Sequence, residues 1–236
     1  MIDFNNYITW NALLPLINED NTSDQIVISS THSGHYGLKR ESKHLPVSLN
    51  EREFNLFIRF IRENNLTCGY ELGTGFGIST LAIGIGMQYT KGIVYTLDSY
   101  VEGEYQYQPV GNTSDKITPV YPQDMKFAIE TIKKFGVRNY VVFLKGNSPE
   151  YALNTFDSYQ PKLDFVFLDC PKVAQDLYRD IHGFKPYLSD KYALFIHDTH
   201  DYQTEAKKIV KEELDIELKF DILQQKFPLA SAFKNI

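Results

Sequence analysis

The chain has 236 residues, of which 43% are hydrophobic and 23% are charged, a balance typical of a globular protein with one domain. Its formal net charge of −6 argues against a broad nucleic-acid-binding surface, which requires a basic face. All apolar runs are shorter than the roughly 18 residues that span a membrane, and no basic residue precedes the first of them. We therefore expect a cytoplasmic protein with no nucleic-acid or membrane partner.

The first part of the chain, residues 1–47, has no regular hydrophobic period and contains turn signals such as NEDNTSD. We expect an irregular segment here and treat it as a candidate lid. Ser48 and Glu51 then form a capping-box pattern, and apolar residues recur at helical spacing as far as Ile61. This pattern predicts the first helix of a domain that spans residues 48–236.

Five short apolar runs predict strands, because nearly continuous apolar runs are typical of parallel strands covered on both faces. They lie near residues 67–72, 93–97, 140–145, 163–168 and 192–196. Helical patterns alternate with them near residues 78–88, 123–135, 173–183 and 202–214. This alternation predicts an α/β fold in which crossover helices join parallel strands.

Two segments depart from the alternation. The tail IELKFDILQQKFPLASAF has no strong helical period and predicts two strands that close one edge of the sheet. The second predicted strand is followed by a long irregular insert at residues 99–122. Because long loops in compact domains are often functional, we expect this insert to belong to the lid.

The stretch CGYELGTGFGIST, residues 68–80, places glycines at every second position directly after a predicted strand. Glycines at such positions let the backbone approach a ligand closely. The dinucleotide pattern G-x-G-x-x-G is not met, because Ile78 occupies the place of the third glycine. Glu71 ends the strand, and a carboxylate there suits a ligand with an amine or a cation better than one with phosphates.

Two further strand ends complete this pattern. Asp98 ends the second strand, where a carboxylate can accept hydrogen bonds from both hydroxyls of a ribose. The segment KGNSPE follows the third strand, and its Asn147 is placed to border an adenine. The glycines alone are weak evidence, but the three features in this order are strong evidence for a nucleoside-containing ligand.

Residues 48–236 resemble a class I S-adenosylmethionine-dependent methyltransferase. The segments VSLNEREFNLFIRFI, YELGTGFGIST, LDFVFLDCPK and FIHDTH are similar to the catechol-type O-methyltransferase branch and related small methyltransferases. The resemblance implies a Rossmann-like, doubly wound, seven-stranded sheet that is mostly parallel and has an antiparallel C-terminal strand. It also implies S-adenosylmethionine as the cofactor, with Glu71 and the glycines at the methionine end, Asp98 at the ribose, and Asn147 and Ser148 at the adenine.

The full set of cofactor-binding residues that the resemblance implies is Glu71, Gly73, Thr74, Gly75, Gly77, Ser79, Asp98, Ser99, Asn147, Ser148 and Asp169. Methyl transfer from a sulfonium is an in-line displacement, so positioning supplies most of the acceleration. A hydroxyl acceptor additionally needs a base or a metal ion that makes its oxygen nucleophilic.

Candidates for this second role follow the fourth and fifth predicted strands. The resemblance implies that Asp169 and Asp198 bind Mg²⁺ or another divalent cation and that Lys172 is the base. Thr199 stands where the branch has an asparagine, and a hydroxyl is a weaker ligand than an amide carbonyl for a hard cation. His197 and His200 are the alternative bases if no metal is bound.

Other interpretations stay open at this stage. Lys172 equally fits an exposed residue in the first turn of a helix after Pro171, and His200 fits a surface loop. An NAD-dependent oxidoreductase would share the fold, and a repurposed, non-methylating relative would keep the glycine motif. We expect a small-molecule acceptor of unidentified class, and a homodimer is compatible with the pattern.

Overall fold

The structure is a computed structural model that describes most of the chain from Glu51 onward. The described residues are the strand segments 27–30, 36–40 and 43–46, residue 49, and the ranges 51–75, 77–99, 125–169, 173–220 and 229–236. Three parts of the predictions lie outside the described residues: Ser48, Lys172, and the insert at 99–122 except Ser99. The predictions for these residues remain predictions. The first part of the chain contains an antiparallel sheet of β1 (Val27–Ser30), β2 (Tyr36–Arg40) and β3 (Lys43–Pro46).

The prediction that residues 1–47 are irregular is therefore wrong for the part that forms these strands. Strands of four or five residues that include glycine and several polar side chains carry too little hydrophobic alternation to be found in the sequence. The lid function assigned to this segment stays a prediction.

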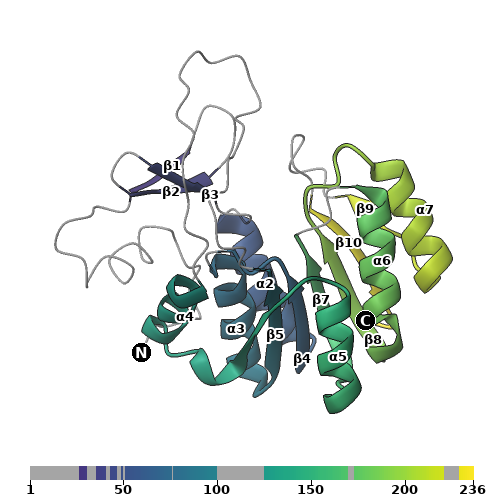
Figure 1. Cartoon of the computed structure of the whole chain (residues 1–236), viewed down its shortest axis with the longest axis horizontal. Helices are drawn as coiled ribbons and strands as arrows, with labels where there is room; N and C mark the ends of the chain where they lie inside the picture. Colours follow the sequence, from purple (N-terminus) through teal and green to yellow (C-terminus); the bar gives the residue numbers. More distant parts are fainter. Residues whose placement is uncertain are drawn as a thin grey trace, which may run out of the picture.

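The central sheet has seven strands in the order β6-β5-β4-β7-β8-β10-β9 (Figure 1). Their bounds are β4 Cys68–Leu72, β5 Ile93–Asp98, β6 Val141–Lys145, β7 Leu163–Leu168, β8 Leu188–Ile196, β9 Lys219–Phe220 and β10 Ala230–Lys234. Strands β4 to β8 pair in parallel, and β10 is antiparallel to both β8 and β9. This confirms the predicted Rossmann-like class, including the two C-terminal strands at one edge.

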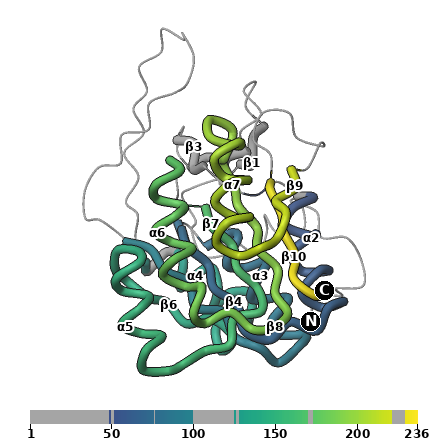
Figure 2. Tube along the Cα trace, turned by 90° about the vertical axis from the view of Figure 1, so that its right-hand side faces the viewer, coloured from purple at the N-terminus to yellow at the C-terminus, as the bar shows by residue number. Residues whose placement is uncertain are grey.

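Six helices of the described residues cover the two faces of this sheet (Figures 1 and 2). They are α2 Glu51–Glu63, α3 Ile78–Thr90, α4 Met125–Lys134, α5 Glu150–Tyr159, α6 Ala174–Phe184 and α7 Gln203–Leu214. One hydrophobic cluster joins α2, α3 and α4 to one face of the sheet, and a second joins α5, α6 and α7 to the other. No helix of the described residues is long and apolar enough to cross a membrane.

One helix and one strand boundary differ from the sequence-based predictions. Helix α5 was not predicted, because it buries only Ala152 and Phe156 and so has a narrow apolar face. Strand β8 begins at Leu188 rather than near residue 192, because its first residues are polar and a register shift separates them from the regular pairing with β7. Cys68 is a free thiol.

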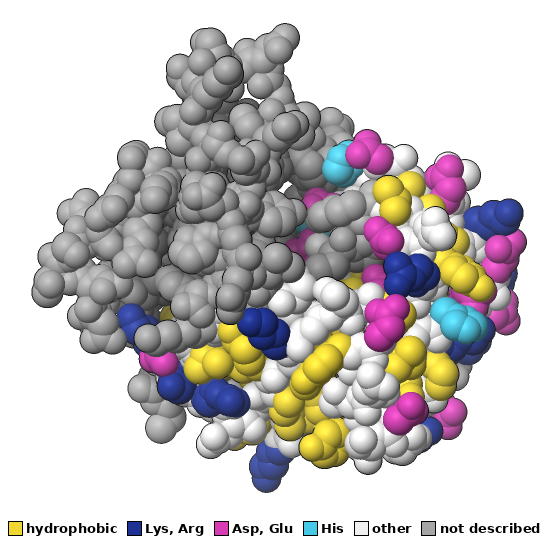
Figure 3. All heavy atoms as spheres, viewed as in Figure 1, with side chains coloured by type: hydrophobic (Ala, Val, Ile, Leu, Met, Phe, Trp, Pro, Cys, Tyr) yellow, Lys and Arg dark blue, Asp and Glu magenta, His cyan; other side chains and the backbone are white. Residues whose placement is uncertain are grey.

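The strand order reverses beside β4, which lies between β5 and β7. In open α/β sheets, ligands bind at the carboxyl ends of the strands on either side of such a reversal. On the face shown in Figure 3, acidic and basic side chains of the described residues are intermixed and form no extended basic patch. The predicted absence of a nucleic-acid partner remains a prediction.

Candidate functional site

The glycine loop connects the end of β4 to the start of α3. Gly75 and Gly77 have positive φ angles of 49° and 82°, a conformation that glycine adopts without strain. A Cβ atom at Gly77 would lie 3.2 Å from the backbone of Ala128, whereas nothing lies within 4 Å of the corresponding position at Gly75. The loop therefore packs tightly against α4 on one side and leaves open space beside Gly75.

Asp98, at the end of β5, is joined to this loop. The backbone N–H of Gly75 donates a hydrogen bond of 2.8 Å to Asp98 Oδ2, and Asp98 is only 9% exposed. The backbone N–H of Gly146, after β6, donates to the carbonyl oxygen of Asp98. The ends of β4, β5 and β6 are thus connected around one carboxylate.

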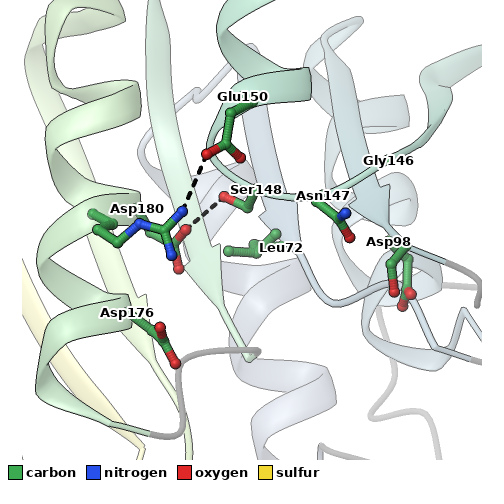
Figure 4. A pocket seen from close by; sticks show the side chains of 10 residues that line it. Leu72, Asp98, Gly146, Asn147, Ser148, Glu150, Asp176 and Asp180 are labelled. Atoms are coloured by element: carbon green, nitrogen blue, oxygen red, sulfur yellow. Dashed lines mark hydrogen bonds and ion pairs between the residues drawn. The ribbon is translucent and has the colours of Figure 1, made fainter.

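A cavity of about 590 Å³ opens at these strand ends, a volume within the range of small-molecule sites (Figure 4). Its lining residues are Leu72, Asp98, Ser99, Gly146, Asn147, Ser148, Glu150, Asp176, Arg179 and Asp180. The structure therefore brings four of the predicted cofactor-binding residues together, namely Asp98, Ser99, Asn147 and Ser148. The glycine-loop residues, Glu71 and Asp169 do not line this cavity.

Glu71 is fully buried beneath the glycine loop. The hydroxyls of Thr80 and Thr96 each donate a 2.5 Å hydrogen bond to its Oε2, while its Oε1 has no hydrogen-bond partner among the described residues. Burial raises the pKa of Glu71 to about 7, against the opposing effect of hydrogen bonds from Ser79, Thr80 and Thr96. Because Thr96 also lies 2.5 Å from Thr74 Oγ1, this carboxyl group supports the loop from below.

The opposite wall of the cavity is polar and was not predicted. Ser148 donates a 2.5 Å hydrogen bond to Asp180 on α6, and Arg179 forms a 3.1 Å ion pair with Glu150 on α5. Burial raises the pKa of Asp180 to about 6, with the Ser148 hydrogen bond acting against it. Sequence reasoning missed this wall because it did not find α5 and had no means of telling which side of α6 faces the strand ends.

A second polar group lies at the ends of β7 and β8, and the pairing of these strands explains it. Phe167 and Phe195 are paired in register, and both rings pack against Phe57 of α2 with centroids 5.0 Å away. Side chains alternate between the faces of a strand, so the residues two positions on point to the same face. Asp169 and His197 therefore come together on the α2 side of the sheet.

His197 is buried among three carboxylates. Its Nδ1 lies 3.1 Å from Asp198 Oδ1 and 3.5 Å from Asp169 Oδ1, and its Nε2 lies 3.9 Å from Glu53 Oε1 on α2. The 3.1 Å distance is within hydrogen-bonding range, yet neither ring nitrogen makes a well-directed hydrogen bond to a described residue. The contacts are therefore electrostatic, and the ring nitrogens keep their capacity for another partner.

The imidazole offsets part of the negative charge of these three carboxylates. Burial lowers the pKa of His197, but Asp198, Asp169 and Glu53 outweigh burial and raise it to about 9. Asp169, His197 and Asp198 each offer one donor atom, and these atoms lie within 4.8 Å of one another. A divalent cation is thus an alternative to the proton as the positive charge of this centre.

The remaining predicted residues are placed as follows. Thr199 is fully buried, and its hydroxyl has no hydrogen-bond partner among the described residues. The side chain of His200 is 39% exposed and lies 3.3 Å from Asp201 Oδ2. Lys172 lies outside the described residues. Glu53 was missed, although an acidic residue four positions before Phe57 on an apolar helix face is a signal that the sequence contains.

Among solved structures, the chain is similar to an O-methyltransferase from Bacillus cereus in complex with SAH, with 13% identity, a TM-score of 0.57, and 79% of this chain and 82% of that chain covered. It is also similar to the O-methyltransferase TomG from Streptomyces achromogenes in complex with SAM, with 12% identity, a TM-score of 0.56 and coverages of 79% and 80%.

A third similar structure is a putative caffeoyl-CoA O-methyltransferase from Staphylococcus aureus, with 17% identity, a TM-score of 0.53 and coverages of 79% and 85%. At these identities the likeness establishes the fold. A family model described as "Methyltransferase domain" matches residues 70–199. This range includes the glycine loop, the cavity, Asp169, His197 and Asp198. Because the match spans more than half of the 236 residues, the chain belongs to this methyltransferase family.

Proposed function

We propose that the protein transfers a methyl group from S-adenosylmethionine to a hydroxyl of a small molecule. The observation that carries this proposal is a cavity lined by Asp98, Asn147 and Ser148 at the ends of β5 and β6. The glycine loop after the neighbouring strand β4 is joined to it by the hydrogen bond from Gly75 to Asp98. The similar solved structures from Bacillus cereus and Streptomyces achromogenes hold SAH and SAM, which supports the same cofactor here.

The residues present suit this cofactor. Asp98 is placed to accept hydrogen bonds from ribose hydroxyls, and Asn147 and Ser148 border the place of the adenine. The open space beside Gly75 admits the methionine end close to the backbone. Glu71 supports the loop that forms this space, and its direct contact with the cofactor stays a prediction.

The charge of the cavity argues against the NAD-dependent alternative. Among the described residues, four carboxylates line it (those of Asp98, Glu150, Asp176 and Asp180), against a single guanidinium, that of Arg179. A pyrophosphate would be repelled by this lining, whereas S-adenosylmethionine carries a sulfonium and an amine. The cavity therefore favours a cationic nucleoside over a dinucleotide.

The His197 centre is the proposed place where the acceptor hydroxyl is activated. The residues present fit a divalent cation, since Asp169 and Asp198 supply carboxylate oxygens. The ring nitrogens of His197 and the hydroxyl of Thr199 are buried nearby, and they have no hydrogen-bond partner among the described residues. When bound, such an ion lowers the pKa of a hydroxyl and fixes its direction. The proton of the acceptor passes to a neighbouring base, for which Lys172 is the candidate when a metal is bound and His197 or His200 when none is bound.

The test is a calorimetric titration of the purified protein with S-adenosylmethionine and, separately, with NADH. We expect a micromolar dissociation constant for S-adenosylmethionine, corresponding to about 8 kcal/mol, and no binding of NADH. Transfer is then measured with labelled cofactor against phenols, catechols and sugars, with added Mg²⁺ and with excess chelator. Binding of NADH without binding of S-adenosylmethionine would refute the proposal, and binding without any transfer would favour the repurposed relative.

A further inference from the structure

Helix α2 carries an acidic residue on its buried face. Glu53 and Phe57 are four positions apart, so they lie on the same face of the helix, one turn from each other. Phe57 packs on the aromatic rings of β7 and β8, and the turn that holds Glu53 lies over the ends of those strands. Glu53 is only 6% exposed, and a buried carboxylate requires a partner.

One partner that this placement provides is His197. Glu53 Oε1 lies 3.9 Å from His197 Nε2, and both side chains are 7% exposed. The other ring nitrogen, Nδ1, is directed towards Asp198 and Asp169. A histidine that binds a metal with one nitrogen commonly offers the other to a carboxylate, which fixes the orientation of the ring.

The separation of 3.9 Å is longer than a hydrogen bond. Such bonds in active sites often tighten only when the site is loaded. Neither nitrogen of the buried ring has a well-directed hydrogen bond to a described residue, so the ring keeps one nitrogen for a ligand and one for Glu53. The acidic cluster is thus accompanied by a buried donor that points into it.

We propose that this centre is a mixed nitrogen and oxygen metal site. His197 Nδ1 is a ligand beside Asp169 and Asp198, and Glu53 is the positioning residue that holds the imidazole. A site with an imidazole ligand favours a first-row transition-metal dication over Mg²⁺, which prefers oxygen ligands. The inference rests on the proposed function only in that the ion serves the same acceptor site.

The experiment uses the full chain freed of metal with a chelator and tests affinity first. Calorimetric titrations are expected to show an affinity for Co²⁺ that is about a hundredfold or more above the affinity for Mg²⁺. Glu53→Gln should weaken Co²⁺ binding about tenfold or more, the usual effect of losing a partner behind a ligating histidine. The matched control is Glu63→Gln, on the same helix, where the side chain is 58% exposed and should leave affinity unchanged.

Spectroscopy tests the ligand directly. The pulsed electron paramagnetic resonance spectrum of the Mn²⁺-loaded protein should show modulation from a coordinated nitrogen, and His197→Gln should remove it. Absence of nitrogen modulation in the unaltered protein overturns the proposal without reference to any variant. Equal Co²⁺ affinities of Glu53→Gln and Glu63→Gln, with circular dichroism showing both folded, would overturn the role of Glu53.

The same samples separate this inference from the proposed function. S-adenosylmethionine binding is measured on the metal-free protein, because the cofactor cavity is lined by other residues. Cofactor binding and transfer without nitrogen coordination would leave the proposed function standing and remove the mixed metal site. Nitrogen coordination without cofactor binding would support the mixed metal site and refute the proposed function.

Discussion

Two regions share the carboxyl edge of the central sheet and are built in different ways. At the ends of β4, β5 and β6, backbone groups and the carboxylate of Asp98 form one side of an open cavity, and the polar side chains of α5 and α6 form its opposite wall. At the ends of β7 and β8, His197 is buried among Asp169, Asp198 and Glu53, which come from different elements. The first region is a shaped space, and the second is a cluster of buried charge.

This difference matches the two tasks of a methyl transfer. A cofactor needs a complementary shape and a few directed hydrogen bonds, whereas an acceptor hydroxyl needs a group that stabilises its developing negative charge. Buried charges are costly unless they are paired, so ionisable clusters of this kind are candidates for functional sites. The four predictions below test how separate the two regions are, from the largest expected effect to the smallest.

The largest effect is expected from Phe57→Ala, because Phe57 is fully buried and holds α2 against β7 and β8. The change should lower the free energy of unfolding by about 4 kcal/mol, measured by urea denaturation. If the regions are separate, the affinity of the folded variant for S-adenosylmethionine should change less than about threefold. Phe233→Ala, at a ring that is 41% exposed, is the control, and an equal loss there would contradict the assignment of Phe57.

Asp98→Ala should act on the first region. We expect the affinity for S-adenosylmethionine to fall about a hundredfold, close to 2.7 kcal/mol, because the ribose would lose a charged acceptor. Calorimetry measures this loss, and Asp190→Ala, at an exposed position in β8, is the matched control. The metal affinity of the second region should not change, and a parallel loss would show that the two regions are coupled.

A smaller, pH-dependent effect is expected from Glu71. Its pKa is raised to about 7 from an ordinary 4.5, so the folded chain holds a proton over this window that the unfolded chain releases. The contribution of the protonated carboxyl group to stability is full below pH 4.5 and is lost as pH rises through 7. From pH 5 to pH 8, the unaltered protein should lose about 2 kcal/mol relative to Glu71→Gln, which cannot ionise.

Chemical unfolding of both proteins across this range measures the difference, and taking the difference removes the effects of other titrating groups such as Asp180. A constant difference would place the pKa of Glu71 near its ordinary value.

The smallest effect is expected from His200→Ala. His200 is exposed beside Asp201, outside the group around His197. We expect kcat/KM for the acceptor found in the panel to change less than about threefold. A general base typically contributes about a hundredfold or more, so a loss of that size would identify His200 as the base and extend the second region to the surface loop.

The sequence allowed the first region to be predicted because its signals are local. Glycines at alternate positions and a carboxylate at a strand end reflect the backbone geometry of single turns. The sequence therefore predicts Gly75, Asp98 and Asn147 as cofactor-binding residues without information on tertiary contacts. The strand alternation likewise predicted the sheet, and only weakly amphipathic elements such as α5 were missed. Helix α5 buries just two residues, and a face that narrow leaves little periodicity to detect.

The sequence by itself determined the fold class, the order of the strand ends that carry the candidate cofactor-binding residues, and the presence of polar residues after β7 and β8. The tertiary structure decided which of these residues meet. The register of Phe167 with Phe195 brings Asp169 to His197, and the packing of Phe57 on both rings brings Glu53 over them. The register pairs residues of two strands that are separated by a helix, and the docking of α2 depends on contacts between residues more than a hundred positions apart. No local pattern contains that information.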